Sequence, residues 1–171
     1  MKQEPGQVKT GTQLYIGAPN GVVVCVDSRS GADLGGRLYH KYSREPVTFT
    51  DTAAMIRGME RLFDRLNFPR ASTNIRSFAG QDTHSIRTAK EMEKVMSDHE
   101  LLGQHGYQET FIVRVQHRQN STWQGRITWA DKDKTVNFRS IWEMVRLMES
   151  ALNEEAPEEE GNRPADWEDN S

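Results

Sequence analysis

The segment GVVVCVDSRSGADLGGRLYH (residues 21–40) is matched 89 residues later by TFIVRVQHRQNSTWQGRITW (residues 110–129). Continued without a gap, the alignment of 21–64 with 110–153 contains eleven identities in 44 positions. The identical positions include Arg29 with Arg118, Gly36 with Gly125, and Arg37 with Arg126. A register that holds across predicted strands, turns and a helix indicates an internal duplication, so we read the chain as two copies of one structural unit.

Each copy has the pattern of a three-stranded meander followed by an amphipathic helix. In the first, runs typical of strands at 22–27, 35–42 and 46–49 precede a helical period for which Asp51 is a natural N-cap. In the second, similar runs at 109–116, 121–129 and 135–138 precede a helix that Ser140 is expected to cap. We therefore predict an α+β fold of two tandem β-β-β-α units, packed as a pseudo-symmetric pair.

The remaining segments divide the chain around these two units. A Pro-Asn-Gly turn predicts a hairpin between 12–16 and 22–27, and 71–78 is a candidate for one more strand. We expect a flexible N-terminus at 1–11, the first unit at 12–78, a linker with some helical character at 79–108, and the second unit at 109–152. Residues 153–171 contain eight acidic residues and one arginine, and we expect them to form a disordered acidic tail. Since the formal charge of the chain is −3, residues 1–152 carry +4.

Alternation along the strands separates a core face from an outer face. In the second unit, the face expected to meet the helix carries Phe111, Val113, Val115, Trp123, Ile127 and Trp129, with Gly125 leaving room for a bulky group such as an indole. The opposite face carries Ile112, Arg114, Gln116, Arg118, Thr122, Gln124, Arg126 and Thr128. Its counterpart in the first unit carries Val23, Cys25, Asp27, Arg29, Gly35, Arg37 and Tyr39.

The outer face allows two interpretations. One face of an antiparallel sheet is commonly solvated, and arginine with threonine suits that role. Alternatively, an arginine-lined sheet binds phosphate backbones or an acidic protein, with Tyr39 available for stacking on a base. The candidate binding residues are Arg29, Arg37, Tyr39, Arg114, Arg118, Gln124 and Arg126.

The sequence gives little indication of catalysis. The single cysteine, Cys25, excludes an internal disulfide and a thiolate zinc site, and the five histidines are not at the usual zinc-ligand spacing. The glycines at 31, 35 and 36 lead into a strand, so they do not form a phosphate-binding loop before a helix. No nucleophile motif or carboxylate pair is recognisable. We therefore expect a protein that is not an enzyme and holds no cofactor or metal. No apolar stretch suits a signal peptide or a membrane span, which favours the cytoplasm.

The stretch from residue 110 to residue 152 resembles the C-terminal part of a family of short proteins from Gram-positive gut bacteria and their mobile elements. The resemblance lies in the run RQNSTWQGRITW, then FRS and a helix. It extends more weakly to GRLYHKYSREPVTF and ASTNIRSF, and it implies no settled activity. At the level of topology alone, the predicted duplication is similar to single-strand-binding proteins of the PUR and Whirly type.

Three functions are consistent with these features. The first is a nucleic-acid-binding module that uses the arginine face. The second is an inhibitor from a mobile element that acts on a nucleoprotein such as a CRISPR nuclease. The third is a bacterial adaptor that binds another protein and has no role with nucleic acid. All three are non-catalytic binding proteins, and the oligomeric state is left open.

Overall fold

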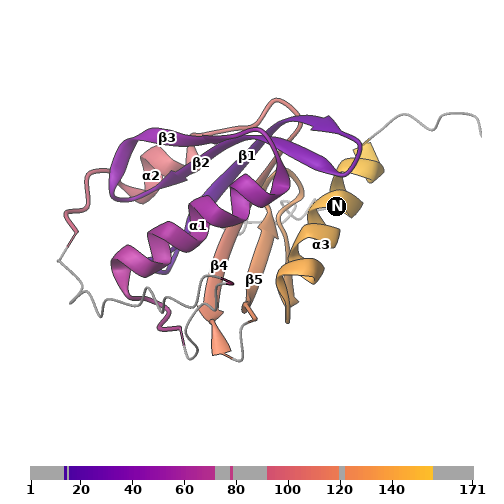
Figure 1. The fold of residues 1–171 in the computed structure, drawn as a ribbon. Coiled ribbons are helices and arrows are strands. Elements are labelled where there is room, and N and C mark those ends of the chain that lie inside the picture. Colours follow the sequence, from indigo (N-terminus) through magenta and orange to yellow (C-terminus); the bar gives the residue numbers. More distant parts are fainter. Residues whose placement is uncertain (1–13, 15, 72–77, 79–91, 120–121, 156–171) are drawn as a thin grey trace, which may run out of the picture.

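Six antiparallel strands form one sheet in the order β3-β2-β1-β4-β5-β6 (Figure 1). The computed structural model describes residues 14, 16–71, 78, 92–119 and 122–155. The first half contains β1 (Val22–Ser30), β2 (Asp33–His40), β3 (Ser43–Phe49) and α1 (Thr52–Leu66). After α2 (Asp98–Leu102), the second half contains β4 (Glu109–His117), β5 (Gln124–Trp129), a short 3₁₀ turn (Ala130–Lys132), β6 (Lys134–Phe138) and α3 (Ile141–Glu155). The predicted α+β class is confirmed.

The strand pairings of the two halves correspond at the same offset of 89 residues. Val24 pairs with Leu38 where Val113 pairs with Ile127, and the bulge between Val26 and Ser28 has its counterpart between Val115 and His117. The halves meet where β1 pairs with β4, and there Val23 lies opposite Ile112, the residue with which the alignment matches it. Both long helices contain 15 residues and begin 89 residues apart.

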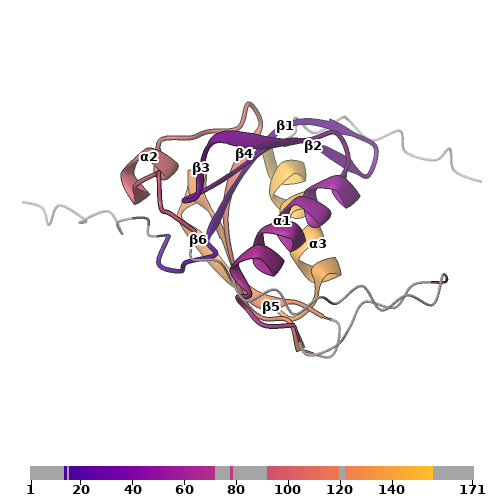
Figure 2. The ribbon, with the colours of Figure 1, turned by 60° about the vertical axis from the view of Figure 1, so that its left-hand side comes forward.

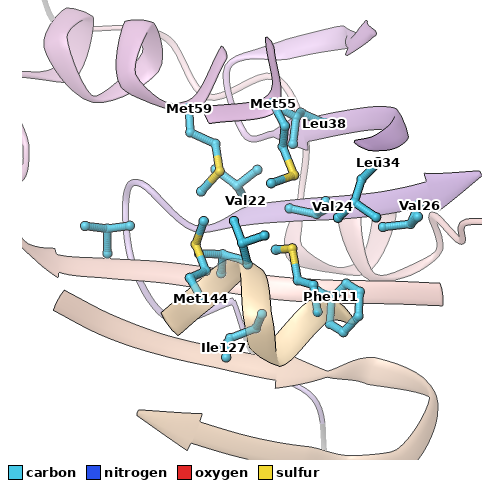
Figure 3. Close-up of a cluster of buried hydrophobic side chains, with 14 of the residues drawn as sticks. Val22, Val24, Val26, Leu34, Leu38, Met55, Met59, Phe111, Ile127 and Met144 are labelled. Atoms are coloured by element: carbon cyan, nitrogen blue, oxygen red, sulfur yellow. The ribbon is translucent and has the colours of Figure 1, made fainter. Parts of the chain in front are cut away.

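The main core lies between the sheet and the two long helices. α1 and α3 cover the same face of the sheet, and α2 lies on the other face (Figures 1 and 2). Met55 and Met59 of α1 and Met144 of α3 pack towards valines of β1 (Figure 3). All six core residues expected in the second unit are buried in this cluster: Phe111, Val113, Val115, Trp123, Ile127 and Trp129.

The aligned glycines Gly36 and Gly125 are explained by a close approach of backbones. A Cβ at Gly36 would lie against the carbonyl oxygen of Cys25, and one at Gly125 would lie against that of Arg114. Both glycines are next to the bulges, where the neighbouring strand comes nearer. The expectation that Gly125 makes room for an indole is therefore wrong, because the strand backbone fills that space.

One expectation about the connecting segments, the strand at 12–16, is corrected at its described residues. Leu14 and Ile16 are not in a strand, since both edges of β1 are already occupied by β2 and β4. In the linker, α2 has only five residues, and 92–97 are not helical. Of the candidate strand at 71–78, Ala71 forms one isolated bridge with Arg118, and 72–77 lie outside the described residues. The predicted flexible N-terminus, the linker residues 79–91 and the tail residues 156–171 also lie outside them, whereas residues 153–155, predicted to be in the disordered tail, belong to α3.

Candidate binding face

The face of the sheet opposite the long helices is covered over its first half. Val23, Cys25, Tyr39 and Ile112 are buried there together with Ile16, Met96 and Leu101. The covering segment is held in place because the N–H groups of Val95 and Met96 both donate to the carbonyl of Lys41, whose ammonium is 2.9 Å from Asp98. Burial raises the pKa of the Cys25 thiol to about 11, so this cysteine is unsuited to act as a nucleophile. The expectation of an exposed outer face is wrong for β1 and most of β2.

Arg37 and Tyr39 are engaged within the fold. The Arg37 guanidinium donates to both carboxylate oxygens of Asp27 at 2.8 and 3.0 Å, to the Tyr39 hydroxyl at 2.8 Å, and to the carbonyl of His105 at 2.8 Å. The hydrogen bond from Arg37 holds the pKa of Asp27 below its usual range. Since Tyr39 is 8% exposed, it cannot offer its ring to a base. Arg37 and Tyr39 thus stabilise the fold, and the charge of Arg37 is already neutralised by Asp27.

No described segment packs over the exposed residues in the second half of this face, although Thr128 within it is buried. Arg126 of β5 pairs with Arg114 of β4 on one side and with Asn137 of β6 on the other. The three residues therefore form one row across the strands. Next to them, the hydroxyls of Thr128 and Thr135 are 2.9 Å apart, and Arg114 donates to Thr128 at 3.4 Å. Arg126, Asn137, Thr135 and Gln124 are exposed, and Arg114 is half-buried. We call Arg114, Gln124, Arg126, Thr135 and Asn137 the open face.

The open face differs in charge from the equivalent part of the first half. Where the first half has Cys25 and Asp27, the second has Arg114 and Gln116 at the aligned positions. Arg126 therefore lacks the carboxylate that binds Arg37, and among the described residues it makes no hydrogen bond or ion pair. Two arginines directly opposite each other on neighbouring strands repel, and this repulsion is relieved when an anion lies between them.

Arg118 and Arg29 lie on the helix side of the sheet. Arg118 is 6% exposed and donates to the carbonyl of Pro69 and to Asp64 of α1, both at 2.7 Å. Arg29 donates to Asn153 of α3, which is the residue aligned with Asp64. Each arginine thus connects the end of its own strand to the helix of the other half. The placement of both on the outer face is wrong, because the bulges in β1 and β4 interrupt the alternation of side chains.

Sequence reasoning did not include Thr135 and Asn137, which complete the open face on β6. The predicted strand at 135–138 is short and polar, so its sequence does not show with which strand it pairs. The glycine at 125 was a usable signal for the bulge, because glycine inside a strand often marks one.

Comparisons of the chain with models of known families, with curated proteins and with solved structures find no match. None of the helices in the described part of the chain has the length and apolar character needed to cross a membrane. Within the same residues, no three histidine, cysteine, aspartate or glutamate side chains are grouped so that they could hold a metal ion.

Proposed function

We propose that the chain is a non-catalytic binding protein, and that its open face holds the phosphate backbone of a nucleic acid, either free or within a nucleoprotein complex. The observation that carries the proposal is the cross-strand pair of the half-buried Arg114 and the exposed Arg126 on the open face. Guanidinium groups donate in a planar fork that matches phosphate oxygens, and the amides and hydroxyls beside them are the usual accessory donors to a backbone. The net charge of +4 on residues 1–152 favours the same ligand.

The composition of the open face favours binding without sequence preference. Its five residues include no aromatic side chain, so stacking on bases does not contribute here. Two arginine contacts would release few counterions, and we expect log K to fall with log salt with a slope of about −1.8 on duplex DNA and about −1.4 on a single strand. Affinity is therefore modest for one copy of the face.

The proposal also includes the relation between the two halves of the chain and the cellular location of the protein. We infer that the halves are a duplicated, pseudo-symmetric pair, supported by the shared register of strands and by the matched contacts of Arg29 and Arg118. The resemblance to short proteins of gut bacteria and their mobile elements supports a cytoplasmic protein, with inhibition of a nucleoprotein such as a CRISPR nuclease as one form of the activity.

Fluorescence polarisation with labelled single-stranded and duplex oligonucleotides at low salt tests this function. Arg126→Glu reverses the charge at the centre of the open face and should weaken binding at least tenfold. Arg57→Glu is the matched control, because Arg57 is exposed on α1 at the opposite side of the sheet. We expect less than a twofold effect from the control. Equal losses from both variants, or no binding by the unaltered chain, would contradict the proposal.

An adaptor that binds a protein is the second candidate. It is favoured by two exposed apolar side chains, Val136 of β6 at 45% and Trp142 of α3 at 67%. Large exposed apolar groups are enriched where proteins meet. A partner that co-purifies after nuclease treatment, and is lost with Trp142→Ala but not with Arg126→Glu, would support the adaptor and exclude the open face as its site.

A further inference from the structure

The two edge strands of the sheet, β3 and β6, have equivalent places in the two halves but differ along their free edges. β3 contains Pro46, which has no N–H to offer, and its Arg44 is held by Glu100 of α2 at 3.2 Å. In β6, Thr135 stands at the position aligned with Pro46. The residues from Lys134 to Asn137 are all exposed, and no strand of the described chain pairs with this edge. An open edge of this kind is a template for another strand.

The hydrogen-bonding groups at this edge can be assigned from their neighbours. The carbonyl of Val115 accepts from the Asn20 side chain at 2.7 Å and so points towards the β1 side. The N–H of Thr110 donates to Asp131, in the 3₁₀ turn after β5, and so points towards the β5 side. Along an antiparallel strand, the N–H and C=O groups of successive residues point alternately to one neighbouring strand and to the other. The N–H and C=O groups of Ile127 therefore point towards Val136 of β6. The N–H and C=O groups of Thr135 and Asn137 consequently point outwards. Pro46 agrees, since a proline in a sheet lies where its missing N–H would face solvent.

We propose that the β6 edge pairs with the β6 edge of a second copy of the chain, antiparallel, about a twofold axis at Val136. In this register Thr135 and Asn137 exchange backbone hydrogen bonds with the partner's Asn137 and Thr135. Val136 meets its own copy, which covers its exposed side chain. Lys134 lies opposite the partner's Phe138, so no like charges oppose each other within the paired strands.

The β3 edge is not available for pairing, so the assembly is limited to two copies. Pro46 removes an outward donor from β3, and α2 is attached to that strand through Arg44 and Glu100. Pairing through β6 alone is isologous and cannot continue into a filament. The dimer has one twelve-stranded sheet, on which the two open faces become continuous. This inference does not depend on what the open face binds.

Sedimentation velocity of the full chain over a range of concentrations tests the dimer. We expect the unaltered chain to approach twice its mass of 19.6 kDa. Thr135→Pro copies the proline of β3 at the aligned position and should give a monomer with an unchanged circular dichroism spectrum. Thr48→Pro is the control, because it makes a comparable change on the β3 edge and should leave the dimer intact. A monomeric unaltered chain, or a Thr135→Pro variant that stays dimeric, overturns the proposal.

A cross-linking measurement tests the register separately and does not require a proline. At a non-hydrogen-bonded antiparallel pair the Cα atoms are about 4.5 Å apart, which is within the range of a disulfide. Val136→Cys should therefore form a covalent dimer on mild oxidation, whereas Asn137→Cys, which faces Thr135 of the partner, should not. The native Cys25 is buried and does not compete. Failure of Val136→Cys to cross-link, or equal cross-linking of both variants, overturns the twofold axis at Val136.

Discussion

Removal of the Arg118 side chain is expected to destabilise the fold far more than removal of its counterpart Arg29. The buried guanidinium of Arg118 donates to Pro69 and Asp64 and lies 5.6 Å from the centre of the Phe63 ring. A hydrogen bond from a charged donor contributes about 1.5–3 kcal/mol, an ion pair with a half-exposed carboxylate up to about 1 kcal/mol, and a guanidinium over a ring about 0.5–1 kcal/mol. Because these contributions share one side chain and are not additive, we expect Arg118→Ala to lower the free energy of unfolding by about 3 kcal/mol.

Arg29 provides the matched comparison. It is exposed and its partner Asn153 is neutral, so Arg29→Ala should lower the free energy of unfolding by only about 0.5 kcal/mol. Urea unfolding followed by tryptophan fluorescence measures both variants, since Trp123 is buried with its ring centre 5.3 Å from that of Phe63. A double-mutant cycle with Asp64→Ala should give a coupling of about 1 kcal/mol. Equal losses from Arg118→Ala and Arg29→Ala would refute the placement of Arg118 against α1.

Two further predictions concern the strands. Gly125→Ala places a methyl group against the carbonyl of Arg114 and should lower the free energy of unfolding by at least about 2 kcal/mol. Gly31 has a positive φ of 61° but open space around it, so Gly31→Ala should lower the free energy of unfolding by only about 1 kcal/mol in the same urea titration. Burial, with a contribution from the charge of Arg65, lowers the pKa of His40 to about 4, and its Nδ1 accepts from the N–H of Tyr42. Between pH 6.5 and 4 the unfolded chain therefore binds more protons, so the stability from neutral His40 is present above pH 6.5 and is lost as the pH falls towards 4. We expect a loss of about 2 kcal/mol between pH 7 and pH 4.5, and His40→Asn, which keeps an acceptor and does not titrate, should remove this part of the dependence. An unchanged pH profile in that variant would exclude His40 as the cause.

Features set by local chemistry were predictable from the sequence. Asp51 accepts from the N–H of Ala54 at 2.7 Å and Ser140 accepts from that of Glu143 at 3.0 Å, so both predicted helix caps are confirmed. Such caps depend only on residues three positions apart. The core face of the second unit was also predictable, because a period of two is a direct consequence of strand geometry.

Features that depend on distant pairing were not predictable in this way. The bulges at Ser28 and His117 exist only once two strands are aligned, and they move Arg29 and Arg118 to the helix side. The burial of Tyr39 follows from packing of the 92–102 segment on β2, which alternation within one strand cannot reveal. The open face was therefore only partly identified: Arg114, Gln124 and Arg126 belong to it, and Arg29, Arg37, Tyr39 and Arg118 do not.

The two pairs of aligned arginines show that residues at matching sequence positions can have the same structural role or different ones. Arg29 and Arg118 keep one role, since each contacts the aligned residue on the helix of the other half. Arg37 and Arg126 share a backbone position but not a chemical setting, because Asp27 neutralises Arg37 and the residue aligned with Asp27 is the neutral Gln116. If this arginine served only to stabilise the fold, we would expect a carboxylate partner such as Asp27 in both halves. Among the described residues Arg126 makes no hydrogen bond or ion pair, and the proposed anionic ligand rests on this difference from Arg37.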